Sequence, residues 1–257
     1  MWSLPPPGPP PLGEGKEFSP RRGEEGGGTK DGHMRYFPIN LAIRDRPVVV
    51  VGGGAVAARK CAQLLDAGAR ITVIAPQLDA RLEAMRDNGE ISHLEREFAR
   101  GDLAGAFLAF AATGNPAVNR AVAKEGKDLG ILTNIADAPE LCDFTLPALV
   151  QRGDLQIAVS TDGNSPALAR RIREELELRY GPEYETALRL LGNLREKLLT
   201  EKGNRAYNTS LFTKLVGHDL PALIRNRSTA EIDHLLTELF GPGNTLAELG
   251  VGEKDTE

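Results

Sequence analysis

Cysteine, histidine and long hydrophobic runs are scarce in this chain of 257 residues. The two cysteines, Cys61 and Cys142, provide neither a disulfide framework nor the spacing of a zinc site. The four histidines form no spaced pair, which argues against a histidine-based metal centre. No apolar run approaches the ~18–20 residues that cross a bilayer, and the N-terminus lacks the apolar stretch of a secretory signal. We therefore expect a cytoplasmic protein without a resident metal or a membrane partner.

Acidic and basic side chains are nearly balanced. The 31 Lys and Arg against 36 Asp and Glu give a formal net charge of −5 at pH 7, which argues against nucleic acid as a partner. Residues 1–33 differ from the rest, because they hold 7 prolines and 8 glycines. Such a segment cannot bury enough apolar surface to offset its ordering entropy, so we predict a disordered tail.

Strand and helix patterns alternate through the region 34–146. Strands are expected at 47–52, 70–75, 91–95, 106–112 and 131–135, and helices at 55–67, 78–88 and 116–129. We expect Gly68 to end the first helix and Asn115 to cap the last one. This alternation is typical of an α/β fold with a Rossmann-type, doubly wound parallel sheet, whose ligands bind at the carboxyl ends of the strands.

The pattern changes after Pro147. A strand at 155–160 and a charged helix from Pro166 to about Tyr180 are expected within a region 147–182. The remainder, 183–257, is predicted to be helical, with apolar faces on helices at 183–201 and 228–240. A lone strand leaves both edges unpaired, so the strand at 155–160 pairs either within the chain or with a partner subunit.

A glycine turn follows the first strand. The apolar run Val48–Val51 reads as a strand buried on both faces, and it leads directly into Gly52-x-Gly54-x-x-Ala57 and a helix. In this context Gly52 permits the tight turn, Gly54 lets the backbone approach a pyrophosphate, and the helix N-terminus offers N–H groups to the anion. The pattern favours dinucleotide binding over a glycine turn without a ligand.

The end of the second strand lacks the acidic residue that usually binds the ribose of NAD. It reads Ile74-Ala75-Pro76-Gln77, with no carboxylate and no arginine for a 2′-phosphate. NAD is therefore favoured over NADP, with Gln77 or backbone groups at the ribose, and another nucleotide stays open.

Asp137 follows the fifth strand, at the edge of the sheet that also carries the glycine turn. A carboxylate there can accept a proton or orient a polar substrate. The alternative is that Asp137 caps the turn at Ala138–Pro139, a common role for aspartate. The sequence leaves these two roles open.

Several separate motifs together resemble a known family. They are Phe37-Pro38-Ile39, Arg44-Asp45-Arg46, Val51 to Lys60, Asn134-Ile135-Ala136-Asp137-Ala138-Pro139 and Ser160 to Ala169. In this order they are similar to the dehydrogenase/chelatase module of siroheme synthases, the precorrin-2 dehydrogenase and sirohydrochlorin ferrochelatase family. The resemblance covers roughly 34–200 and has no counterpart for the tail.

The resemblance implies NAD-dependent oxidation of the tetrapyrrole precorrin-2 to sirohydrochlorin, followed in some members by insertion of Fe²⁺ to give siroheme. It places cofactor contacts on Ala55 and Val56 and on Pro76 and Gln77, and it matches the essential aspartate of the family to Asp137. It also implies an NAD-binding domain over 34–146 and a dimerisation region over 147–182, and hence a homodimer.

Three arginines are candidates for binding the carboxylates of such a substrate: Arg170, Arg171 and Arg173. Their alternative role is pairing with glutamates one turn away on a solvated helix face. Two other functions stay open, a nucleotide- and tetrapyrrole-binding module without turnover and an NAD-dependent oxidoreductase with another substrate. The chain has no Tyr-x-x-x-Lys pair of the kind used by short-chain oxidoreductases.

Overall fold

The computed structural model describes residues 35–202 and 209–251. The predicted tail at 1–33 lies outside the described residues. The fold described below is that of the unit that begins at Ile39.

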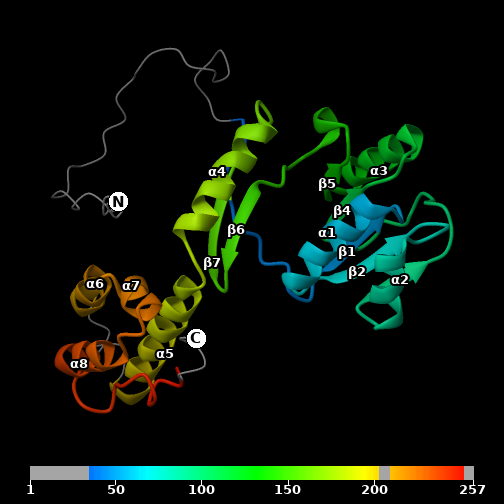
Figure 1. The fold of residues 1–257 in the computed structure, drawn as a ribbon. Coiled ribbons are helices and arrows are strands. Elements are labelled where there is room, and N and C mark those ends of the chain that lie inside the picture. Colours follow the sequence, from blue (N-terminus) through cyan, green and yellow to red (C-terminus); the bar gives the residue numbers. More distant parts are fainter. Residues whose placement is uncertain (1–34, 203–208, 252–257) are drawn as a thin grey trace. The chain divides into compact units, whose positions relative to one another are not determined.

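The first part of this unit is an α/β domain. Its elements are β1 (Pro47–Val51), α1 (Ala55–Asp66), β2 (Arg70–Ile74), α2 (Ala80–Asp87), β3 (Ile91–Leu94), β4 (Leu108–Ala111), α3 (Pro116–Leu129) and β5 (Leu132–Ile135). The described residues form a five-stranded sheet in the order β3-β2-β1-β4-β5, and every pair in it is parallel (Figure 1). This topology confirms the predicted Rossmann-type fold and each predicted element of the domain.

Strand β1 is the centre of the sheet and is buried on both faces. Val48 and Val50 pack with α1 and α2 in one core cluster, whereas Val49 and Val51 pack with α3 in another. None of the four valines is more than 8% exposed. The helices therefore cover both faces of the sheet, as the apolar run predicts.

The predicted helix ends are confirmed. Gly68 follows α1 with a φ of 76°, and its N–H donates to the Leu65 carbonyl. Asn115 caps α3 by accepting from the Ala117 N–H at 2.9 Å. Cys61 of α1 is fully buried, and burial raises the pKa of its thiol to about 12, so it is a core residue.

A hairpin follows the domain. After the short helix η1 (Pro139–Leu141), strands β6 (Ala148–Arg152) and β7 (Leu155–Val159) pair antiparallel. The expected strand at 155–160 thus pairs within the chain, and its partner at 148–152 was missed in the sequence. The signal for it is the Gly153-Asp154 dipeptide between the two strands, which is typical of a tight hairpin turn.

Helix α4 (Pro166–Arg179) packs against this hairpin. Ser165 caps it by accepting from the Leu168 N–H at 3.2 Å. The predicted start of the helix at Ser165–Pro166 is therefore confirmed.

The C-terminal part is helical, as predicted, but it has more helices than the sequence indicated. Its helices are α5 (Glu183–Lys202), α6 (Thr209–Gly217), α7 (Leu220–Arg225) and α8 (Thr229–Phe240). They bury a core of their own, to which α5 contributes Leu190 and Leu194 and α8 contributes Ile232 and Leu236. The apolar faces predicted for α5 and α8 are the faces that form this core.

Candidate functional site

The glycine turn is held tightly between the ends of two neighbouring strands. A Cβ on Gly52 would lie 2.3 Å from the Ala112 carbonyl oxygen, and its φ of 123° is open only to glycine. A Cβ on Gly53 would lie 1.8 Å from the Gln77 carbonyl oxygen, while the Gly53 oxygen accepts from the Asp79 N–H at 2.7 Å. The first two glycines therefore fix the path of the backbone.

The third glycine faces open space. No heavy atom lies within 4 Å of a Cβ placed on Gly54. Gly54 is also the N-cap of α1 and supplies no side chain to the helix terminus. Ala55 and Val56, the next two residues, are exposed. The free N–H groups and positive end of the helix dipole therefore lie at an open surface, which fits the pyrophosphate of a dinucleotide.

The turn after β2 lies against this glycine turn through the contact between Gly53 and Gln77. Pro76 and Gln77 are both exposed there. The first carboxylate after β2 is Asp79, which caps α2 by accepting from the N–H groups of Arg81 and Leu82. Because that carboxylate is engaged, the neutral Gln77 side chain is an exposed polar group that can take its place next to the glycine turn.

Asp137 lies in the turn after β5. The register aligns Val51 of β1, Ala111 of β4 and Ile135 of β5 in one row. A strand spacing of about 4.8 Å puts the ends of β1 and β5 roughly 10 Å apart. The glycine turn and Asp137 thus follow the same end of the sheet, as predicted from the sequence.

The conformation of Asp137 is unusual. Its φ is 61°, in the left-handed region that few non-glycine residues adopt. The residue is exposed, and within the described part of the chain its carboxylate has no hydrogen-bond or ion-pair partner. Helix η1 has Ala138 as its N-cap and no capping side chain. The carboxylate therefore does not cap the turn, which was the alternative role.

Both ends of this turn are clamped. On one side, the Ala136 N–H donates to the Ala111 carbonyl at 2.7 Å. On the other, the Cys142 sulfur accepts from the Ile135 N–H at 3.1 Å and donates to the Ile135 carbonyl at 3.2 Å. Because the backbone is hydrogen-bonded on both sides of Asp137, the residue is held in its left-handed conformation and cannot move to a more common one.

Asp143 adds a further clamp. Its carboxylate accepts from the Thr133 N–H at 2.8 Å and from the Thr133 hydroxyl at 3.0 Å, and its N–H donates to the Thr133 carbonyl. Neither Cys142 nor Asp143 was predicted as part of the site. Their only signal in the sequence is that both follow Asp137 within six residues.

The arginines of α4 are engaged in ion pairs. They pair at i,i+4 with glutamates of the same helix, in the pairs Arg170–Glu174, Arg171–Glu175 and Arg173–Glu177. This is the alternative considered for them; two of the pairs are exposed, and the pair Arg173–Glu177 is partly buried. Among the described residues, no group of three or more His, Cys, Asp or Glu side chains is arranged to hold a metal ion.

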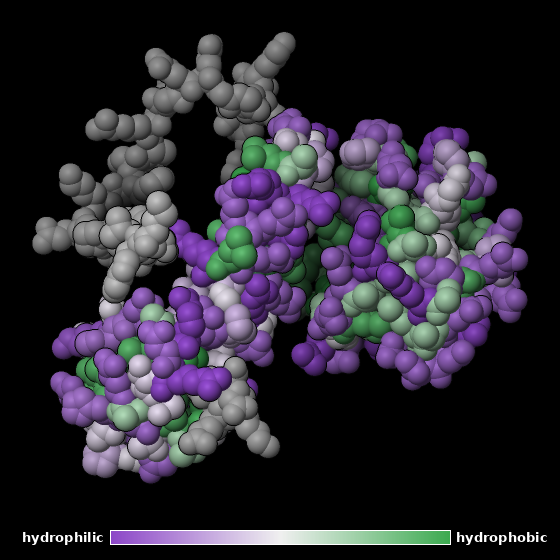
Figure 2. Space-filling view, viewed as in Figure 1, coloured by the Kyte–Doolittle hydropathy of each residue, from purple (hydrophilic) through white to green (hydrophobic). Residues whose placement is uncertain are grey.

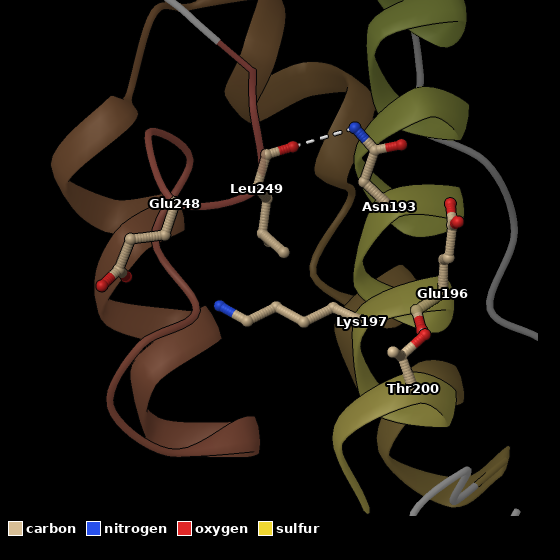
Figure 3. Close-up of a pocket in the computed structure, with 6 residues that line it drawn as sticks. All are labelled: Asn193, Glu196, Lys197, Thr200, Glu248 and Leu249. Carbon is tan, nitrogen blue, oxygen red and sulfur yellow. Dashed lines mark hydrogen bonds between the residues drawn. The ribbon is translucent and has the colours of Figure 1, made fainter. Parts of the chain in front are cut away.

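A cavity of about 500 Å³ lies in the C-terminal part (Figure 3). It is lined by Asn193, Glu196, Lys197, Thr200, Glu248 and Leu249. Two of its charged side chains are engaged, since Lys197 donates to the Gly243 carbonyl and Glu248 accepts from Thr245. None of the predicted site residues lines this cavity, so the end of the sheet remains the candidate site.

Comparison with known proteins agrees with this geometry. A model for putative NAD(P)-binding proteins matches residues 39–148, and a model for the central part of sirohaem biosynthesis proteins matches 152–178. The siroheme synthase of Methylococcus capsulatus is 44% identical over 165 residues, 64% of this chain and 35% of that protein. Siroheme synthase 3 of Aeromonas hydrophila is 34% identical over 86% of this chain and 48% of its own length.

The deciding comparison is structural. The solved structure of SirC, a precorrin-2 dehydrogenase, matches with a TM-score of 0.64 and 28% identity, over 79% of this chain and 98% of that one. The chain belongs to the siroheme synthase and precorrin-2 dehydrogenase family. It spans about a third to a half of the length of the two siroheme synthases, and nearly all of the SirC chain.

Family membership confirms two predictions from the sequence, the recognition itself and the nicotinamide dinucleotide as cofactor. The individual contact residues stay predictions: Gly52, Gly54, Ala55, Val56, Pro76 and Gln77 for the cofactor and Asp137 for catalysis. No helix in the described ranges has the length and apolar character needed to span a membrane. The cytoplasmic location stays a prediction.

The open space at Gly54 gives a test of the cofactor site. The variant Gly54→Val is expected to fold normally, because a Cβ at this position has no heavy atom within 4 Å and the φ of −93° suits any residue. The added side chain occupies the surface that the pyrophosphate approaches, so the Kd for NAD⁺ is expected to rise at least about tenfold. Calorimetry measures the Kd and thermal unfolding the fold. Normal NAD⁺ affinity in a folded variant contradicts the assignment.

Proposed function

We propose that the protein catalyses the NAD-dependent oxidation of precorrin-2 to sirohydrochlorin. The observation that carries this proposal is the unpartnered, exposed carboxylate of Asp137, held in a left-handed turn at the end of the sheet that carries the glycine turn. The likeness to a precorrin-2 dehydrogenase over nearly its whole chain supports the choice of substrate.

In this proposal, Gly52 and Gly54 let the backbone approach the cofactor, and the N-terminus of α1 receives its pyrophosphate. Ala55, Val56, Pro76 and Gln77 complete the contacts, with Gln77 at the ribose. The absence of a free carboxylate or an arginine at the Pro76–Gln77 turn favours NAD over NADP.

Oxidation of the reduced macrocycle removes a hydride from a ring carbon and a proton from the macrocycle. The bound nicotinamide supplies the acceptor for the hydride. Asp137 accepts the proton, because its carboxylate has no partner within the described part of the chain that competes for this role. The clamps at Ala136 and Cys142 hold the carboxylate in place while the substrate binds.

Replacement of the catalytic carboxylate tests this function. Asp137→Ala is expected to lower kcat by about a hundredfold to ten-thousandfold, the range for loss of a general base. NAD⁺ affinity is expected to be unchanged. The assay incubates the protein anaerobically with precorrin-2 and NAD⁺ and follows NADH and the sirohydrochlorin spectrum.

A matched control is Glu140→Ala, which removes another exposed carboxylate three residues away. It is expected to keep full activity. Wild-type protein that binds both ligands without forming NADH would instead be a binding module. Full activity in Asp137→Ala would leave that residue only a turn position.

Insertion of Fe²⁺ into sirohydrochlorin is a second activity that we propose for the same site. Chelation removes pyrrole protons as the cation enters, and a carboxylate both accepts protons and binds a hard cation. The rate of Fe²⁺ or Co²⁺ insertion is expected to exceed the spontaneous rate with wild-type protein and to return toward it with Asp137→Ala. Equal rates with and without wild-type protein restrict the function to dehydrogenation.

We also propose a homodimer formed through the hairpin and α4. The hairpin has only two strands of five residues, too few for a stable sheet alone, and both outer edges are unpaired within the described residues. Helix α4 exposes Leu168 and Leu178, the latter at 90%, and Figure 2 shows hydrophobic side chains within its hydrophilic surface.

Light scattering tests the dimer. Wild-type protein is expected to have the mass of two chains, and Leu178→Glu is expected to shift it toward one chain because it places a charge in the interface. The control is Leu129→Glu, at an exposed leucine of α3 outside the proposed interface. A monomeric wild type contradicts the proposal.

A further inference from the structure

A partly buried cation lies beside the strand that carries the Asp137 turn. Lys60 of α1 donates from Nζ to the Asn134 Oδ1 at 2.7 Å, across 74 positions of sequence. The same Nζ lies 5.1 Å from the centroid of the Phe110 ring. Burial lowers the pKa of the Lys60 amine, and the neighbouring Arg59 acts in the same direction.

The Lys60 ammonium fixes the orientation of the Asn134 amide. An ammonium only donates, so the amide oxygen must face Lys60 and the amide NH₂ must face the other way. That NH₂ donates to the Phe144 carbonyl at 3.0 Å. The Phe144 ring in turn packs edge-on against Phe110, with ring centroids 5.6 Å apart. Lys60, Asn134 and Phe144 thus link α1 to the chain that returns from the Asp137 turn.

This link is costly for a purely structural contact. Burying an ammonium and an amide carries a desolvation penalty, and well-packed apolar side chains are often at least as stabilising in such a place. The polar link instead fixes an orientation, because the Asn134 amide can accept from Lys60 and donate to the Phe144 carbonyl in only one way round.

We propose that Lys60 is a positioning residue for Asp137. Its ammonium orients Asn134, and Asn134 holds the chain at Phe144, so that the segment 136–144 keeps Asp137 in its left-handed, exposed conformation. Lys60 acts through Asn134 and not on the substrate. This inference deepens the proposed dehydrogenase function and rests on it.

A double-mutant cycle separates positioning from general stabilisation. Lys60→Met is expected to lower kcat about 10–100-fold with an unchanged Kd for NAD⁺, because it misplaces the carboxylate without touching the cofactor turn. In an Asp137→Ala background it is expected to cause no further loss, since the residue that it positions is gone. The control is Lys124→Met, which removes an exposed lysine paired with Asp128 and is expected to have no effect.

A second variant tests the same link from its middle. Asn134→Asp keeps an acceptor for Lys60 but replaces the donor to the Phe144 carbonyl with an oxygen. It is expected to lower kcat by the same factor as Lys60→Met, again with unchanged NAD⁺ binding, which also reports that the variant is folded. The inference is overturned if, in either double mutant with Asp137→Ala, the fold-loss of kcat equals the product of the losses of the two single variants.

A second measurement does not depend on turnover. If wild-type protein fails to oxidise precorrin-2, the proposed function is wrong, and the link is then read from alkylation of Cys142. The Cys142 sulfur is hydrogen-bonded to the Ile135 N–H and carbonyl, in the same turn that Lys60 is proposed to hold. The variant Lys60→Met is therefore expected to raise the alkylation rate of Cys142 at least about fivefold above the rate in Lys124→Met. Cys61 does not interfere, because it is buried and its thiol has a pKa of about 12. An unchanged rate overturns the inference by itself.

Discussion

The absence of space for a side chain at Gly52 and Gly53 is the constraint on which the rest of the site depends. At both positions a Cβ would meet a carbonyl oxygen of a neighbouring strand end, Ala112 for one and Gln77 for the other. The ends of β1, β2 and β4 can therefore lie close together only if the turn is glycine. Because the turn is so tight, α1 begins immediately after it, with its N-terminus open at the end of the sheet.

The two halves of the site are held in different ways. The cofactor half is fixed by backbone contacts, which need small residues and tolerate few others. The Asp137 half is fixed by side chains that come from later in the chain, above all Cys142 and Asp143. The first kind of constraint acts through steric exclusion and the second through hydrogen bonds, so the Asp137 half depends more on the identity of individual polar groups.

Local signals explain most of what could be predicted from the sequence. Some features depend only on residues that are neighbours in the sequence: the valine run, the glycine turn, and the helix starts at Asn115 and Ser165. The structure has each of them. Asp137 was placed at the correct end of the sheet because it follows a predicted parallel strand. The family resemblance supplied the substrate class, which no local pattern contains.

The missed features have physical reasons. Strand β6 is short and pairs with a neighbour only two residues away, so a turn signal was available but its apolar alternation was weak. Helices α6 and α7 are short, and the N-cap residue of α7, Asp219, makes no capping hydrogen bond with its side chain. The bond from Lys60 to Asn134 joins residues 74 positions apart, and only the tertiary fold brings such groups together.

The clamps on β5 have a consequence for association between molecules. This strand is at the edge of the sheet, and a free edge is a template on which a foreign strand can add. Here the outward N–H groups of Thr133 and Ile135 are already taken by Asp143 and Cys142. These side chains occupy the donors at the sheet edge, so a strand of another molecule cannot pair with β5 there and aggregate. The residues that hold the Asp137 turn are the same ones that cover this edge, so a substitution of Cys142 or Asp143 affects the turn and the sheet edge together.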